Sequence, residues 1–135
     1  MSFDQCIYLI KNRRGLKELY RAGDEDIPED LNTVDEFQWL QREYSVQQFM
    51  FELAKAKGIR DKNDFYGSYL RVRAEDLKSL YDIVQPAALA QYASKWYDSK
   101  YEYDEQAQER IRRFCKKIIY AVTHEGVAAY YSSDW

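Results

Sequence analysis

The last ten residues constrain the fold of this chain more than any other segment. The segment 126–135, GVAAYYSSDW, carries two tyrosines and a tryptophan among small and hydroxyl-bearing residues. Chain termini are usually polar and frayed, and a free tail of this composition would expose a large apolar surface to water. We therefore expect residues 127–135 to form the final strand of a sheet.

Two further segments have the pattern of strands. Residues 3–10 end in a β-branched and aromatic run, and residues 68–73 alternate between apolar and basic side chains. A period of two is typical of a strand with one buried face, so Leu70 and Val72 are expected to point inward. Together with the tail, these segments predict a small sheet of about three strands.

The predicted helices lie between the strands. Residues 33–36, TVDE, match a capping box, which predicts a long helix from there to about Lys57, with Gly58 as its C-terminal stop. A shorter helix is expected over residues 16–20. Residues 24–36 carry seven acids and no base, and we expect most of this segment to be a solvated surface loop.

The C-terminal half predicts three more helices. Residues 75–84 have apolar side chains on one face, and Pro86 suits the first turn of the next helix. A 3.6-residue apolar period over residues 105–123 predicts the last helix, with Asp104 as its cap. Because the strands are few and separated by helices, we expect one α+β domain over residues 1–135, with four to five helices packed on a small sheet.

Composition and charge limit the function classes. The 135 residues are 46% hydrophobic and 32% charged, which is typical of one soluble folded domain. The net charge of -3 makes nucleic acid an unlikely partner for the molecule as a whole. The apolar runs are shorter than the ~20 residues of a membrane span, and no signal peptide is recognised, so a cytoplasmic location is expected. Cys6 and Cys115 match no metal spacing and are expected to be free, buried thiols.

The sequence contains no recognisable catalytic, cofactor or metal motif. His124 could serve as a general base, but its place near a helix C-terminus favours a structural role, since a cationic imidazole interacts favourably with the helix dipole. The acidic loop at residues 24–36 lacks the ligand spacing of a calcium loop, so it is expected to be solvated or to contact a basic partner. No cofactor is predicted.

Two surfaces are candidates for binding a partner. The connector after the predicted helix that starts at Pro86 presents an aromatic group, because Tyr97, Tyr101 and Tyr103 follow Trp96 with charged residues between them. Tyrosine and tryptophan are enriched at the centres of protein interfaces, although these rings could instead cover a sheet edge. The last helix carries basic residues on its outer face, expected to be solvated or to contact an acidic partner or phosphate: Arg110, Arg112, Arg113, Lys116 and Lys117.

Three blocks of the sequence resemble a known group. They are residues 37–42 (FQWLQR), 68–77 (SYLRVRAEDL) and 130–135 (YYSSDW). Together they are similar to a group of small uncharacterised proteins encoded by bacteriophages and prophages, over roughly residues 37–135. The chain departs from that group at residues 41–44, where Arg-Lys-Ala-Asn is usual, and through the extra Asp134. The resemblance implies a phage setting and supplies no catalytic residues.

We expect a non-enzymatic phage accessory protein that binds and modulates a host protein. Small size, an acidic balance, 13 tyrosines and the lack of a catalytic motif favour this interpretation. One alternative is a small enzyme with its site around His124, and another is nucleic-acid binding through the basic face of residues 105–123. Self-association is left open.

Overall fold

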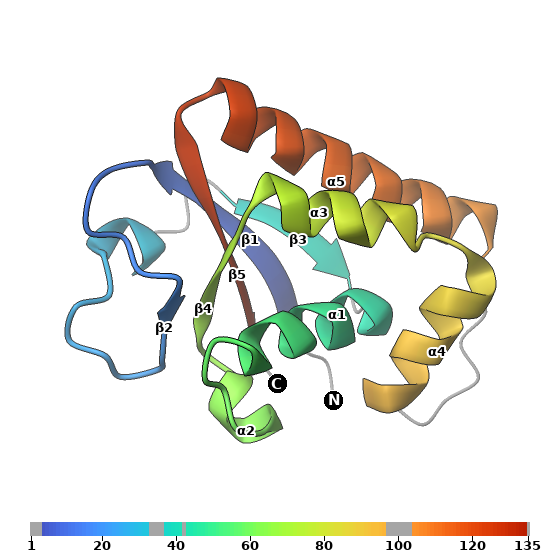
Figure 1. Cartoon of the computed structure of the whole chain (residues 1–135), viewed down its shortest axis with the longest axis horizontal. Coiled ribbons are helices and arrows are strands. Elements are labelled where there is room, and N and C mark those ends of the chain that lie inside the picture. The colour runs from blue at the N-terminus through green and yellow to red at the C-terminus, as the bar shows by residue number, and fades with distance from the viewer. Residues whose placement is uncertain (1–3, 33–36, 42, 97–103, 135) are drawn as a thin grey trace.

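The computed structural model describes residues 4–32, 37–41, 43–96 and 104–134. In this part of the chain, one five-stranded sheet is combined with five α-helices and a short 3-10 helix (Figure 1). The strands are β1 (Asp4–Lys11), β2 (Leu19–Tyr20), β3 (Phe37–Gln41), β4 (Tyr69–Val72) and β5 (Val127–Asp134). The helices are η1 (Glu29–Asn32), α1 (Tyr44–Lys55), α2 (Lys62–Phe65), α3 (Ala74–Asp82), α4 (Pro86–Trp96) and α5 (Glu105–His124). The expected α+β class is confirmed.

The sheet is antiparallel and is organised around its C-terminal strand. The strand order is β2-β4-β5-β1-β3, so β5 lies between β4 and β1. The pairing of β5 with β1 runs the full length of both strands, from Asp4 opposite Asp134 to Lys11 opposite Val127. The expectation that the tail completes the sheet is confirmed for residues 127–134, and Trp135 lies outside the described residues.

The two faces of the sheet are covered by different parts of the chain. Helices α1, α3 and α5 lie over one face, where Ile7, Leu70 and Tyr131 belong to the main core, and α4 packs against α1 (Figure 1). The segment between β1 and β3 covers part of the other face, and its Tyr20 and Leu31 bury a second, smaller core. Alternation along the strands explains this division, since successive side chains point to opposite faces.

The second core gives the acidic loop a structural role. Leu31, in η1, is buried within this acidic segment, and Ile27 packs against the same core. Around it, Asp30 accepts from the guanidinium of Arg13 at 3.0 Å, and Asp26 pairs with Lys17. The described part of the loop is therefore tied to the chain that precedes it.

Two expected helices are corrected by the structure. Residues 19–20 form β2, because their backbone pairs with β4, and this long-range pairing outweighs local helix preference. The long helix begins at Tyr44, and residues 37–41 form β3 against β1 instead. Aromatic residues at alternate positions suit a strand as well as a helical stripe, and β1 offers an edge of unpaired backbone groups. The capping box at residues 33–36 lies outside the described residues.

The other helix predictions are confirmed closely. Helix α4 begins at Pro86, and the Asp104 carboxylate accepts a hydrogen bond from the backbone N–H of Ala107 at 2.8 Å, which caps α5. Gly126 follows α5 at φ 65°, a conformation that glycine adopts without strain, and turns the chain into β5. Cys6 and Cys115 are buried and free, as expected.

Candidate binding site on helix α5

Helix α5 concentrates positive charge on a chain that is acidic as a whole. Its inner face is apolar with a helical period and is buried against the core by Ala107, Ile111, Phe114, Cys115, Ile118 and Ala121. The remaining positions carry five basic residues and two glutamates, which gives the helix a net charge of +3 with neutral histidine. The whole chain has a net charge of -3, so the rest of the sequence is strongly acidic. The outer face of α5 therefore stands out electrostatically.

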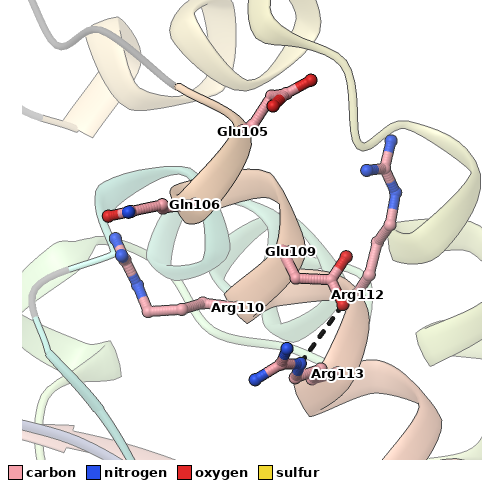
Figure 2. Close-up of a pocket in the computed structure, with 6 residues that line it drawn as sticks. All are labelled: Glu105, Gln106, Glu109, Arg110, Arg112 and Arg113. Carbon is pink, nitrogen blue, oxygen red and sulfur yellow. Dashed lines mark hydrogen bonds and ion pairs between the residues drawn. The ribbon is translucent and has the colours of Figure 1, made fainter.

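The first half of α5 borders an open hollow. Six residues line it: Glu105, Gln106, Glu109, Arg110, Arg112 and Arg113. Figure 2 shows Arg110 extending to one side of the helix and Arg112 to the other, with Glu109 between them and joined to Arg113 below. The lining thus mixes both signs of charge, with the arginines in excess.

Each arginine of the hollow has a defined partner. Arg112 donates to the carbonyl oxygen of Val84 at 3.0 Å, which ties α5 to the end of α3. Arg113 pairs with Glu109 one turn earlier at 3.2 Å. Arg110 reaches across to α1 and places its Nη2 3.1 Å and its Nε 3.3 Å from the same Oε1 atom of Glu43. The contact of Arg113 with Glu109 is exposed, whereas Arg110 joins the surface to a buried carboxylate.

Glu43 is the most unusual group near the hollow. Its side chain is 2% exposed, while that of Arg110 is 57% exposed. Oε1 receives both bonds from Arg110, and the buried Oε2 has no hydrogen-bond partner among the described residues. Burial raises the pKa of Glu43, and the guanidinium of Arg110 partly opposes that rise. A buried carboxylate is costly unless it is paired, so the ionised form of Glu43 depends on Arg110.

The backbone of Glu43 is held by β1. The Gln5 side chain accepts from the Glu43 N–H at 2.6 Å and donates to the Glu43 carbonyl at 3.0 Å. The same Nε2 also lies 2.7 Å from the hydroxyl of Tyr131, which donates in turn to Oε1 of Gln47. Gln47 Nε2 completes the network by donating to Ser133 at 2.7 Å. Side chains from β1, β5 and α1 therefore fix the position of Glu43 beneath Arg110.

The second half of α5 presents an aromatic ring among cations. Tyr120 is 59% exposed, and its ring centroid lies 4.7 Å from that of His124. Residues three or four apart lie on one side of a helix, so Arg113 and Lys117 continue this row toward the hollow. Lys116 lies beside it, with Nζ 5.7 Å from the centroid of Tyr81 on α3. We call this row, Lys116 and the hollow together the α5 surface.

Of the four residues predicted to form the aromatic contact, the structure describes Trp96. Trp96 is 7% exposed and makes edge contacts with Phe51 and Phe65, and Lys62 Nζ lies 4.6 Å from its ring centroid. Trp96 therefore packs in the core and does not present its ring to a partner. The other three predicted contact residues, Tyr97, Tyr101 and Tyr103, lie outside the described residues, and their role stays a prediction.

His124 lies where the sequence places it, as the last residue of α5. Its described contact is the ring of Tyr120, which makes it part of the α5 surface. Among the described residues, no group of three or more histidine, cysteine, aspartate or glutamate side chains is arranged to hold a metal ion. Across those same residues, no helix is both long and apolar enough to cross a membrane.

Sequence reasoning identified the basic face but missed the pair behind it. Glu43 and Arg110 are separated by 67 positions, and no motif links them. The sequence signal that could have indicated this pair is Gln5, a polar residue that begins the buried run of β1. A buried glutamine needs partners for both ends of its amide, which predicts a network without naming its members.

Comparisons of the chain with models of protein families, with curated proteins and with solved structures find no match.

Proposed function

We propose that this chain is a non-enzymatic binding protein that uses the α5 surface to hold an acidic region of another protein. The observation that carries the proposal is Tyr120, which is 59% exposed in a row of basic side chains. Among the residues that the structure describes, the other large hydrophobic side chains are at least partly buried, and Tyr120 is exposed. Tyrosine and arginine are enriched among residues that dominate binding energy, and clustered charge speeds the encounter with a partner of opposite sign.

An acidic protein suits this surface better than nucleic acid does. Two glutamates line the hollow, and one of them is paired with Arg113. A phosphate backbone presents a continuous row of negative charge, which these glutamates and the acidic remainder of the chain would repel. A protein partner can place isolated carboxylates opposite the basic residues and an apolar side chain opposite Tyr120.

A bacterial host protein as the partner, and a phage origin of the chain, stay predictions that depend on the resemblance of its sequence blocks. A catalytic role for His124 is the alternative, and a His124→Ala variant that folds and still binds when it is added to the capture experiment below argues for recognition.

The test compares three proteins as bait in a host lysate treated with nuclease. The wild type is matched with a variant of the proposed surface, Lys116→Gln/Tyr120→Ala, and with Arg14→Gln, which removes an exposed charge from the turn after β1. We expect a stoichiometric protein that is retained by wild type and by Arg14→Gln and weakened at least tenfold in the double variant. Equal capture by all three proteins, or a captured species that nuclease removes, would contradict this function.

A further inference from the structure

We propose that Arg110 is the anchor for a carboxylate of the acidic partner, and that Glu43 holds Arg110 in the free protein and takes up a proton from water when the partner's carboxylate replaces it. This deepens, and rests on, the proposed function. It assigns the α5 surface a specific contact and makes binding dependent on pH.

The position of Arg110 is the first step. Its guanidinium lies at the boundary between the hollow, which it lines, and the buried Glu43, to which it donates two bonds. Because the Arg110 side chain is more than half exposed, a ligand can reach it from the hollow without unfolding the surrounding structure. Arginine matches a carboxylate with two parallel donors, and Glu43 occupies these donors through only one of its oxygens.

The second step is what happens to Glu43 when Arg110 turns away. Its Oε2 has no hydrogen-bond partner among the described residues, so the loss of Arg110 would leave a buried charge with no compensation. A carboxylate in that position is neutralised by a proton rather than kept ionised. The exchange is balanced, since one ion pair is lost, another forms with the ligand, and one proton passes from solvent to Glu43.

The groups around Glu43 favour this direction. From α5, Arg110 opposes protonation and the Asp104 charge promotes it, and burial is the largest influence raising the pKa of Glu43. From β1, Gln5 contacts only its backbone and is neutral. Glu105 and Glu109 also line the hollow, on the same helix as Arg110. The cation that opposes protonation is thus the one that the ligand removes.

The mixed lining favours a carboxylate as the occupant. Glu105 and Glu109 would repel a doubly charged group more strongly than a singly charged one. Arg112 is held by the Val84 carbonyl, and Arg113 by Glu109, whose carboxylate is exposed. Of the three, Arg110 is the arginine that pairs with a buried carboxylate, which a proton must neutralise when the arginine leaves. An aspartate or glutamate side chain of a protein partner therefore fits best.

The sign of the pH dependence follows from this exchange. Glu43 binds its proton more tightly in the complex than in the free protein, so affinity rises as the pH falls from neutral toward 5. A ligand aspartate stays ionised over this range, because its ordinary pKa is about 3.9. A simple contact between aspartates and arginines would show no such rise.

The test is calorimetric titration with an acetylated hexa-aspartate peptide at low salt, at pH 5.5 and 7.5, in two buffers of different ionisation enthalpy. For the wild type we expect about tenfold tighter binding at pH 5.5 than at pH 7.5, together with proton uptake on binding. Glu43→Gln should bind equally at both pH values with no proton uptake, and Arg110→Gln should lose most of the affinity.

Two matched variants isolate Glu43. Glu109→Gln removes an exposed carboxylate from the same helix and should keep the pH dependence, and His124→Gln, which removes the histidine of the α5 surface, should keep it too. The NMR titration of the Glu43 carboxyl in unmodified protein gives a direct readout, and its pKa should rise when the peptide is added. An unchanged Glu43 titration, or a pH dependence that persists in Glu43→Gln, overturns the inference.

The outcomes also separate this inference from the proposed function. If the peptide binds and Lys116→Gln/Tyr120→Ala weakens it while Arg110→Gln does not, the α5 surface stands and the role of Arg110 fails. If the peptide does not bind at either pH, both fail.

Discussion

Removing one hydroxyl from the centre of the sheet should destabilise this protein measurably. The Tyr131 side chain is fully buried in the main core, and its hydroxyl accepts from Gln5 and donates to Gln47. In Tyr131→Phe, the Gln47 oxygen loses its donor and the Gln5 amide loses one of its two acceptors. Leaving a buried polar group unsatisfied costs about 1–3 kcal/mol, so we expect a loss of about 2–4 kcal/mol in the free energy of unfolding.

Thermal and urea denaturation measure this loss. Unfolding entropy scales with chain length, and for 135 residues the expected loss lowers Tm by about 7–14 °C. Tyr120→Phe is the matched control, because its hydroxyl is on the exposed face of α5 and its removal should change stability by less than about 0.5 kcal/mol.

A double-mutant cycle separates the network from the loss of a single contact. Gln47→Met keeps the length of the side chain and removes the acceptor for Tyr131. If the two residues act as one unit, Tyr131→Phe/Gln47→Met is destabilised by at least about 0.5 kcal/mol less than the sum of the single variants. A Tyr131→Phe protein within 0.5 kcal/mol of wild type, or strict additivity in the cycle, would refute the reasoning.

Three further predictions follow from burial and strand order. Deleting residues 127–134 removes the strand that joins β4 to β1, so the variant should lack native chemical-shift dispersion in its NMR spectrum; a dispersed spectrum contradicts this. Burial raises the pKa of Glu43, so the folded protein binds this proton more tightly than the unfolded chain does, and the resulting stabilisation is full below pH about 4.5 and is lost as the pH rises through the folded pKa. Glu43→Gln should therefore be more stable than wild type at pH 7 and no more stable at pH 4, as judged by urea denaturation. Burial raises the pKa of the Cys115 thiol to about 12, so a thiol-reactive dye should label it only after unfolding, and rapid labelling of the native protein at pH 8 would show that the site is open.

The parts of the fold that were predictable are those with a strong local signal. The alternation of Leu70 and Val72, the apolar period of α5 and the aromatic tail each have one solution that buries their apolar side chains. Local signals failed at residues 37–41, where alternate aromatic residues suit a helix or a strand and the unpaired edge of β1 decides between them. They failed again at residues 19–20, whose strand exists only through its pairing with β4.

Of the candidate site, only the basic outer face of α5 could be predicted from the sequence. The basic outer face of α5 can be read from helical spacing, because it depends on residues within one element. The pair of Glu43 with Arg110 and the clamp by Gln5 join three elements that are distant in sequence, so only the folded chain brings them together. Trp96 shows a further limit of the sequence, since an aromatic residue at the end of a helix can cover the core, as this one does, as readily as it can face a partner.

The most direct test of the account maps the acidic ligand onto the protein without any mutation. Backbone amide chemical shifts of isotope-labelled wild type are followed while the hexa-aspartate peptide is added at pH 5.5 and low salt. The α5 surface predicts the largest changes over residues 109–124 and at Glu43, with little change along β2 and β4. Changes confined to other elements, or none at saturating peptide, would contradict binding through α5.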